Sequence, residues 1–362
     1  MLAGGRLTRT IWPAADRDAV FIIDQRQLPH RLQVECLNRP ADVARAIREM
    51  WVRGAPLIGA AAAYGMALQT GTAGSDAALQ ACEAMLVATR PTAVNLAWAL
   101  QRMMKRLGPL PIAQRHAAAW AEAAALCDDD VAVNHAIGRH GLALLQGIAA
   151  HRDGPVRVLT HCNAGWLATV DRGTALAPVY AAQEAGIDGF GWADETRPRN
   201  QGASLTAWEL GQQGVPHKVI TDNAGGHLMQ HGEVDIVIVG CDRVSARGDV
   251  CNKIGTYLKA LAAHDNGVPF YAAMPVSTLD LGVADGLRGI PIEERSAREV
   301  THMMGRSAGG ETIEVQVVPD GSAAANPAFD VTPARLVSGL ITEFGVVDAA
   351  PAALQQLKGR CT

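Results

Sequence analysis

The second half of the chain alternates short apolar runs with longer amphipathic stretches. Five runs have the length and composition of buried strands: V-R-V-L-T (156–160), G-F-G-W-A (189–193), K-V-I-T (218–221), D-I-V-I-V-G (235–240) and P-F-Y-A-A (269–273). Helical stretches lie between them at a spacing of roughly 20–30 residues. Apolar strands that alternate with helices are typical of a parallel sheet buried on both faces. The pattern predicts a doubly wound sheet, with a further strand at 312–318 and a helix that opens at Thr332–Pro333.

Residues 1–150 follow a different pattern. Short strand candidates lie at 20–26 and 32–36, and from Ala41 onward the chain is rich in alanine with helical periodicity. Gln80–Leu107 and Pro111–Ile148 are expected to form long helices with a break near Gly108–Pro111. The chain is therefore predicted to be an α/β protein, with a smaller, mainly helical N-terminal domain (1–150) that carries a few antiparallel strands, and a parallel-sheet domain (151–362).

Composition narrows the class of protein. The 362 residues are 49% hydrophobic and 19% charged, which is typical of a folded chain. A formal net charge of −4 argues against nucleic acid as a main partner. The first residues lack the apolar core of a secretory signal, and the apolar stretch Ala55–Leu68 is too short to span a membrane. Seven cysteines without a C-x-x-C pair indicate free thiols in a reducing cytoplasm.

Polar side chains follow four of the predicted strands directly. They are H-C-N (161–163), D-E-T (194–196), D-N (222–223) and C-D-R (241–243). In an open parallel sheet, ligands bind beyond the carboxyl ends of the strands. We therefore expect these four groups to meet at one edge of the sheet and to form the active or binding site.

Cys162 and Asp242 are the two candidate catalytic residues at this edge. A thiol at a strand end beside His161 could be reactive, and a neighbouring helix N-terminus would lower its pKa; the alternative is a buried structural cysteine. Asp242 follows a nearly all-apolar strand, where desolvation raises the pKa of a carboxyl and leaves a neutral acid. The alternative is a structural anion paired with Arg243, Arg247 or Lys253.

Two further stretches suit the recognition of phosphate. R-G-A-P-L-I-G (53–59) places Arg53, Gly54 and Ala55 at the start of a helix, where free N–H groups and the helix dipole favour an anion. N-K-I-G-T (252–256) offers Asn252 and Lys253 at another helix start, after a loop, and Arg90 is the only candidate anion contact in R-P-T-A-V-N-L. Each stretch is also compatible with a plain helix start. Neither is a nucleotide-binding motif, so no nucleotide cofactor is expected.

His227 and His231 are spaced like a pair of metal ligands on one helix face. The sequence H-L-M-Q-H has neither an H-E-x-x-H pattern nor an obvious third ligand. We interpret both as surface or packing residues, and we expect no metal.

Taken together, these stretches resemble the methylthioribose-1-phosphate isomerase family. The matching segments run in order from about residue 53 to 345 and are R-G-A-P-L-I-G-A-A-A-A-Y-G, R-P-T-A-V-N-L, L-T-H-C-N-A-G, D-E-T-R-P-R-N-Q-G-A-S-L-T-A-W-E-L, I-T-D-N-A-G-G-H-L-M, V-G-C-D-R, G-D-V-C-N-K-I-G-T-Y, P-F-Y-A-A-M-P-V-S-T-L-D, I-P-I-E-E-R and N-P-A-F-D-V-T-P. The wider superfamily includes regulatory subunits of the eukaryotic initiation factor that exchanges guanine nucleotide.

The resemblance implies a Rossmann-like C-terminal domain, a homodimer, no cofactor and a role in methionine salvage. It implies Cys162 and Asp242 as the catalytic pair, and a substrate site formed by Arg53, Gly54, Ala55, Arg90, Gln201, Asn252 and Lys253. The implied reaction converts 5-methylthioribose 1-phosphate into 5-methylthioribulose 1-phosphate. The hydrogen moves from C2 to C1 either as a hydride or through an enolate, and the sequence leaves both routes open.

Three alternative functions remain at this point. 5-Deoxyribose 1-phosphate differs from the expected substrate by one apolar contact, worth about 1–3 kcal/mol. Ribose 1,5-bisphosphate would need a second cationic cluster, which the sequence does not reveal. A non-catalytic regulatory subunit would be expected to lack the thiol or the acid, and this chain has both.

Overall fold

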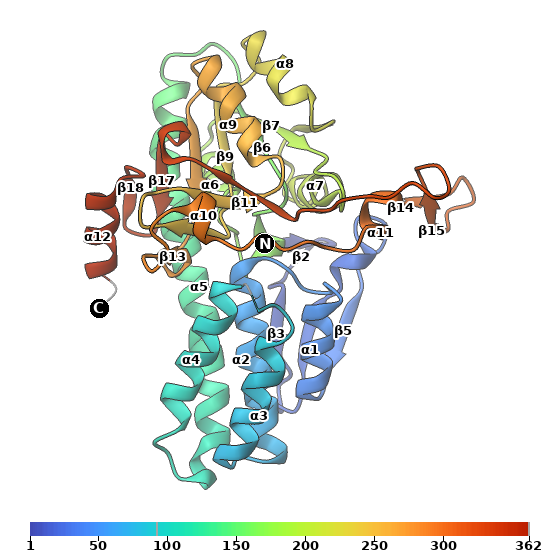
Figure 1. Cartoon of the computed structure of the whole chain (residues 1–362), viewed down its shortest axis with the longest axis vertical. Coiled ribbons are helices and arrows are strands. Elements are labelled where there is room, and N and C mark those ends of the chain that lie inside the picture. Colours follow the sequence, from blue (N-terminus) through green and yellow to red (C-terminus); the bar gives the residue numbers. More distant parts are fainter. Residues whose placement is uncertain (92, 361–362) are drawn as a thin grey trace.

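The fold was analysed in a computed structural model that describes residues 1–91 and 93–360. The N-terminal part combines small antiparallel sheets with a group of helices (Figure 1). Its strands are β1 Leu2–Ala3, β2 Arg6–Leu7, β3 Ile11–Pro13, β4 Val20–Ile23 and β5 Val34–Leu37. Its helices are the 3-10 turn η1 Gln25–Gln27, α1 Pro40–Arg48, α2 Ala55–Thr72, α3 Asp76–Val87, α4 Val94–Leu107 and α5 Ile112–Ala149. Strands β3, β4 and β5 pair in sequence order.

The expectation of one long helix over Gln80–Leu107 is wrong, because this segment contributes to two helices, α3 and α4. Pro91 lies between them. A proline disfavours helical geometry at the residue before it and offers no N–H to the helix. The break places Arg90 between α3 and α4.

The helices of this part surround α2. Every α2 side chain from Leu57 to Leu68 is buried, which is typical of a helix that is covered on all sides. Helix α5 packs on two cores. Its first half contributes Trp120 and Leu126 to the helical core, and its second half contributes Ile137 and Leu145 to the core under the sheet. A division of the chain at residues 150 and 151 stays a prediction.

The C-terminal part is built on a seven-stranded sheet in the order β18-β17-β12-β9-β6-β7-β8. Its strands are β6 Val156–Thr160, β7 Gly189–Asp194, β8 His217–Ile220, β9 Ile236–Val239, β12 Phe270–Ala273, β17 Gly339–Thr342 and β18 Gly345–Val347. All neighbours are parallel except β17 and β18. The five strands expected from the apolar runs are thus present.

Helices cover both faces of this sheet, as the alternation of strands and helices predicts. They are α6 Ala177–Glu184, α7 Ala207–Gln212, α8 Ala224–Gln230, α9 Thr256–Asp265 and α12 Pro351–Gly359, with the turns η2 Trp166–Ala168 and η3 Gly202–Thr206, the latter π-helical. Val156 and Val158 of β6 pack toward α5, α6 and α7. Leu159, on the opposite face of the same strand, packs in the core of α8, α9 and α12. The Rossmann-like fold is therefore confirmed.

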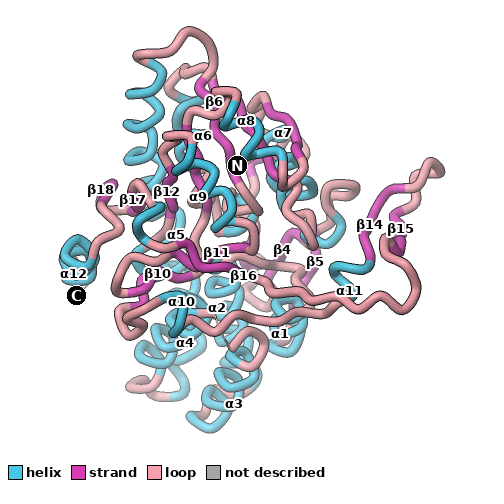
Figure 2. The backbone as a smooth tube through the Cα atoms, turned by 45° about the horizontal axis from the view of Figure 1, so that its top comes forward, coloured by secondary structure: helices cyan, strands magenta, loops and turns pink. Residues whose placement is uncertain are grey.

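A second, four-stranded sheet lies between the helices α1–α4 and the large sheet (Figure 2). Its order is β13-β10-β11-β16, formed by Leu279–Asp280, Arg243–Ser245, Val250–Lys253 and Phe329–Thr332. Of residues 245–251, expected as a loop, 246–249 form the turn of the β10–β11 hairpin, whereas Ser245, Val250 and Cys251 belong to its strands. In this hairpin Arg243 pairs with Cys251. The turn η4 Val276–Thr278 precedes β13.

Of two expectations for the C-terminal region, the strand at 312–318 is confirmed, although it lies outside the large sheet, and the helix at Thr332–Pro333 is wrong. The run at 312–318 forms β15 (Thr312–Gln316), which pairs only with β14 (His302–Arg306) in a hairpin that projects from the body and not with the large sheet (Figure 1). At Thr332–Pro333 only the turn η5 (Ala334–Leu336) follows, because the chain goes on directly to β17. The short helices α10 (Gly286–Gly289) and α11 (Arg298–Thr301) lie in the long connection before β14. Among the described residues, no helix combines the length and apolar character needed to cross a membrane.

Candidate functional site

Cys162 and Asp242 lie where the strand order of the large sheet changes direction. From β6 the chain proceeds through β7 and β8 toward one edge, and from β9 through β12 and β17 toward the other. Cys162 follows the carboxyl end of β6, and Asp242 follows the carboxyl end of its neighbour β9. This crevice is the preferred ligand site of open α/β sheets.

One cavity at this point is lined by all nine residues that the sequence and its resemblance assign to the site. They are Arg53, Gly54, Ala55, Arg90, Cys162, Gln201, Asp242, Asn252 and Lys253. These residues come from the start of α2, the connection before α4, the ends of β6, β9 and β11, and the turn before α7. Segments distant in the sequence thus converge on one cavity, which is what a binding site for a small molecule requires.

Cys162 is held in an uncommon backbone conformation. Its φ angle is 65°, in the left-handed region. Its N–H donates to Thr196 Oγ1 at 2.7 Å, and its thiol donates to Gln201 Oε1 at 3.2 Å. Burial raises the pKa of Cys162, whereas the positive charges of Arg53 and Lys253 oppose the rise. The net shift is upward, because desolvation outweighs the nearby positive charges. The expected effect of a helix N-terminus on this pKa stays a prediction.

Asp242 connects the large sheet to the four-stranded sheet. Its N–H donates to the carbonyl of Cys251 at 2.9 Å, which fixes the turn between β9 and β10. Burial raises the pKa of its carboxyl, and the charges of Lys253, Arg90 and Arg53 oppose the rise. The side chain thus has the bias toward a neutral acid that its place in the sequence predicts.

Arg243 and Arg247, the other charges considered as partners of Asp242, bind other carboxylates. Arg243 lies 3.5 Å from Asp280, and Arg247 lies 3.0 Å from Asp285. The structure therefore gives these two arginines roles in other ion pairs and leaves Lys253 as the neighbouring cation of the alternative interpretation.

Arg53 lies in the cavity wall and is 6% exposed. Its guanidinium donates to both the side-chain and backbone oxygens of Asn163. Gly54 follows with a φ of 96°, and a Cβ atom there would lie 2.4 Å from the carbonyl oxygen of Ala168, so only glycine fits. Helix α2 begins at the next residue, Ala55, with its N-terminus at the cavity.

The remaining predicted residues, Arg90, Asn252 and Lys253, also line the cavity. The Lys253 ammonium donates to the carbonyl of Ala328 at 2.8 Å and lies 4.9 Å from the centre of the Phe329 ring. The Asn252 amide donates to Thr256 Oγ1 at 3.0 Å. Arg90 forms an ion pair with Glu293 at 3.2 Å. With Arg53, these cations give the cavity the positive field that a phosphate needs.

Comparison with known proteins places the chain in a family. The model of the Initiation factor 2 subunit family matches residues 51–349. The chain belongs to this family. It is 62% identical to the methylthioribose-1-phosphate isomerase of Methylorubrum extorquens over 350 residues, which cover 97% of this chain and 96% of the relative. The resemblance found in the motifs is therefore confirmed.

Two solved structures show the same fold over nearly the full length. The 5-methylthioribose 1-phosphate isomerase from Pyrococcus horikoshii OT3 matches with a TM-score of 0.84 and 40% identity, covering 98% of this chain and 97% of that one. Subunit delta of the translation initiation factor eIF-2B from A. fulgidus matches with a TM-score of 0.80 and 37% identity, covering 96% and 100%. Enzymes and initiation-factor subunits of the family thus share this architecture.

A group of ionic residues beside the cavity was missed by the sequence reasoning. Arg295 lines the cavity and binds Glu293 at 2.8 Å and Glu299 at 2.6 Å. Because Glu293 also binds Arg90, this group orients one of the predicted substrate contacts. Its signal was the motif I-P-I-E-E-R (290–295), which lies outside regular structure and therefore shows no periodicity.

The residues with metal-binding side chains occupy two places. His227 of α8 and His231, which directly follows this helix, are exposed, and their rings are tilted at 44° with centres 4.2 Å apart. His231 Nδ1 donates to the carbonyl of His227. His161, Asp194 and Asp222 form the second group, with potential ligand atoms within 4.8 Å of one another. This group already contains a cation, because Lys259 Nζ lies 3.1 Å from Asp194 Oδ2, the same oxygen that His161 Nδ1 contacts at 2.9 Å.

Replacement of Arg53 tests the assignment of the phosphate site. Arg53→Ala is expected to raise KM by about tenfold to 150-fold, because a charge-assisted hydrogen bond contributes about 1.5–3 kcal/mol. Arg53→Lys keeps the positive charge but loses the forked geometry, so it should show a smaller rise. Steady-state kinetics of variants with a wild-type melting temperature measures the effect. An unchanged KM in folded Arg53→Ala would contradict the assignment.

Proposed function

We propose that this protein converts 5-methylthioribose 1-phosphate into 5-methylthioribulose 1-phosphate, an aldose–ketose isomerisation in methionine salvage. The observation that carries the proposal is the single cavity at the sheet crevice, where Asp242 and Cys162 meet the seven expected substrate contacts. The relatives named for this activity cover nearly the whole chain, which supports the same reading.

The first chemical step falls to Asp242. A sugar with phosphate on C1 is a cyclic acetal without a free aldehyde, so its ring oxygen must gain a proton before the C1–O bond breaks. A carboxyl that burial biases toward the neutral form supplies that proton. The Arg53, Arg90 and Lys253 cations bind the phosphate and counter the negative charge that forms on Asp242.

We assign the transfer of a second proton to Cys162. When hydrogen moves from C2 to C1, one proton leaves the C2 side, from the hydroxyl in a hydride shift or from the carbon in an enolate route. The thiol lines the same cavity as Asp242, with Gln201 as its hydrogen-bond partner. In the hydride shift, Cys162 reacts as the thiolate and takes the proton of the C2 hydroxyl. In the enolate route, the thiolate takes the proton from C2 and returns it to C1, and the Asp242 carboxylate formed in the first step takes the proton of the C2 hydroxyl. In both routes, the proton given to the ring oxygen is balanced by one released from the C2 hydroxyl.

An apolar pocket adjoins the cavity and suits the methylthio end of the sugar. It shares Gly54, Arg90 and Asp242 with the main cavity. Its apolar lining comprises Ile58, Ala93, Val94, Ile290, Pro291 and Phe329. Of the two arginines at this pocket, Arg90 is assigned to the C1 phosphate, and Arg243 already lies 3.5 Å from Asp280. A thioether therefore fits this pocket better than the second phosphate of ribose 1,5-bisphosphate.

The assembly and location of the protein are also part of the proposal. We infer a homodimer and a cytoplasmic enzyme that needs neither a metal nor a nucleotide cofactor. The inference rests on the family resemblance, on the cysteines without a pairing pattern and on the lack of a nucleotide-binding motif in the sequence.

Turnover of the purified protein with three sugars tests the function. 5-Methylthioribose 1-phosphate is expected to give the highest kcat/KM, 5-deoxyribose 1-phosphate to lose about tenfold to 150-fold through one missing apolar contact, and ribose 1,5-bisphosphate to react least. The activity should persist with excess chelator and without nicotinamide. No turnover of any sugar would favour the non-catalytic regulatory subunit, and a preference for the bisphosphate would reverse the assignment of the apolar pocket.

A further inference from the structure

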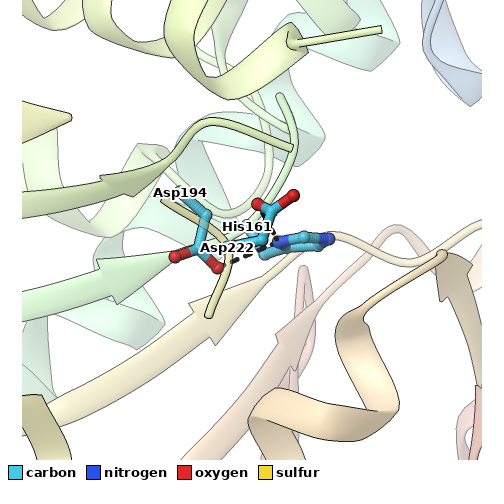
Figure 3. A group of neighbouring side chains, drawn as sticks. All are labelled: His161, Asp194 and Asp222. Atoms are coloured by element: carbon cyan, nitrogen blue, oxygen red, sulfur yellow. Dashed lines mark hydrogen bonds and ion pairs between the residues drawn. The ribbon is translucent and has the colours of Figure 1, made fainter. Parts of the chain in front are cut away.

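The ring of His161 joins two of the segments that carry site residues. Its Nδ1 lies 2.9 Å from Asp194 Oδ2 at the end of β7, and its Nε2 lies 2.8 Å from the carbonyl oxygen of Ile254 (Figure 3 shows the Asp194 contact). A backbone carbonyl only accepts hydrogen bonds, so Nε2 carries the hydrogen. Ile254 directly follows Asn252 and Lys253, and Cys162 directly follows His161. The ring therefore links the segment that carries Cys162 to the segment that carries Asn252 and Lys253.

Close packing supports this bridge. Gly255 has a φ of 102°, and a Cβ atom there would lie 2.9 Å from the His161 ring. Asp330 of β16 accepts the N–H groups of Gly255 and Tyr257 at 2.7 and 3.1 Å, and so holds the segment from the other side. A side chain at position 255 would therefore collide with the His161 ring.

The neighbours of His161 fasten a third segment to the same place. The Asp222 carboxylate accepts the N–H groups of Thr196 and Arg197, both at 2.7 Å, and Thr196 Oγ1 in turn accepts the N–H of Cys162. A Cβ atom on Gly202 would lie 1.6 Å from the carbonyl oxygen of Asp194, so the turn that follows Gln201 packs directly on the end of β7. Lys259 adds a positive charge beside Asp194.

We propose that His161 is a positioning residue that fixes the distance between Cys162 and the Asn252–Lys253 segment. His161 lines the cavity, but protein groups bind both of its ring nitrogens, so we infer that it acts through these neighbours and not on the substrate. The inference rests on the proposed function, because it assigns catalysis to Cys162 and substrate binding to Asn252 and Lys253.

Two substitutions distinguish the two hydrogen bonds of the His161 ring, one to Asp194 and one to Ile254. In His161→Asn, the amide takes the place of Nδ1 and keeps a hydrogen-bonding group for Asp194, but the side chain is too short to reach Ile254. In His161→Gln, the longer side chain places an amide nitrogen near the position of Nε2 and restores the donor for Ile254. His140→Asn is the matched control, because His140 Nδ1 also contacts a backbone carbonyl, that of Thr342 at 2.9 Å, outside the cavity.

His161→Asn is expected to raise KM about tenfold or more, because one hydrogen bond that orders the binding segment is lost. His161→Gln should recover a KM within about threefold of the wild type, and His140→Asn should match the wild type. A KM in folded His161→Asn equal to that of the wild type, or a His161→Gln variant no better than His161→Asn, would overturn the proposal. If His161→Asn does not fold, a folded His161→Gln with a tenfold higher KM overturns it, and one with a wild-type KM supports it.

A second measurement does not depend on turnover. The rate at which iodoacetamide alkylates Cys162, followed by mass spectrometry, should rise in His161→Asn and stay at the wild-type rate in His161→Gln. Equal rates in the two variants would contradict the bridge. An inactive wild-type protein would contradict only the proposed function, since the alkylation rates would still decide whether His161 holds the thiol segment in place.

Discussion

Asp242→Asn is expected to lower kcat by about 10²–10⁴, the contribution typical of a positioned general acid. The amide keeps the shape of the carboxyl but has no proton to give to the ring oxygen of the sugar. KM should change much less, because the missing interaction develops in the transition state. Steady-state kinetics of the purified variant measures both values.

The pH dependence of kcat provides a second check on Asp242. Burial raises the pKa of this carboxyl, and the reaction uses the protonated form. Activity should therefore fall as the pH rises through that pKa, and Asp242→Asn should lose this high-pH limb. A raised pKa also means that the carboxylate destabilises the folded state above the pKa of a free carboxyl, so the variant should melt no lower than the wild type at neutral pH.

Asp130→Asn is the matched control for this prediction. Asp130 is also a carboxyl whose pKa burial raises, to about 7, but it lies in α5 and accepts the N–H of Val170. Its replacement should leave kcat unchanged. If Asp242→Asn turns over within about tenfold of the wild type, the acid lies elsewhere; Asp222 and Glu195 on the same sheet edge would be examined next.

The strands of the large sheet could be predicted because a strand that is buried on both faces is apolar at nearly every position. Val237 and Val239 pack toward α8 and α9, whereas Ile236 and Ile238 pack toward α5 and α6, so the strand between them must be apolar throughout. The position of the site followed from the same pattern. The carboxyl ends of parallel strands share one edge, and residues after the strands are therefore brought together.

Pairing between distant segments was not predictable in the same way. Residues 312–318 have a strand-like composition, but β15 is exposed along its whole length and pairs only with β14. Strand β17 (Gly339–Thr342) is buried in the sheet, yet it is only four residues long and follows a proline-containing turn. Composition indicates that a segment is extended, but the partner depends on contacts that periodicity does not record.

In the candidate site, too, the reactive side chains could be predicted, whereas the hydrogen bonds that hold them in place could not. Cys162 and Asp242 were found from their chemistry and their place after strands. The contacts that hold them, such as Thr196 to the N–H of Cys162 and His161 to Ile254, join residues separated by 34 and 93 positions. Single-sequence reasoning finds the reactive groups first because their types are rare at strand ends, whereas their supports are ordinary polar residues.

Cys162→Ser is expected to remove most of kcat, with a loss of about 10² or more. The hydroxyl keeps a hydrogen-bond donor toward Gln201, but it is a far weaker acid than a thiol and cannot exchange the proton on the C2 side. Cys82→Ala is the matched control, since Cys82 is buried in the helical core and burial raises its pKa to about 12. Cys241 and Cys251 serve less well as controls, because both line the cavity or the adjoining pocket.

Alkylation identifies the thiol on which activity depends. Among the cysteines within residues 1–91 and 93–360, Cys36 is exposed and should react first without loss of activity, so the experiment is best done in Cys36→Ser. Cys162 is 8% exposed and burial raises its pKa, so iodoacetamide should react slowly near neutral pH and faster as the pH rises. Loss of activity should parallel modification of Cys162, and the substrate should slow both, because it fills the cavity that the reagent must enter. If inactivation instead follows modification of another cysteine, Cys162 does not have the role assigned to it.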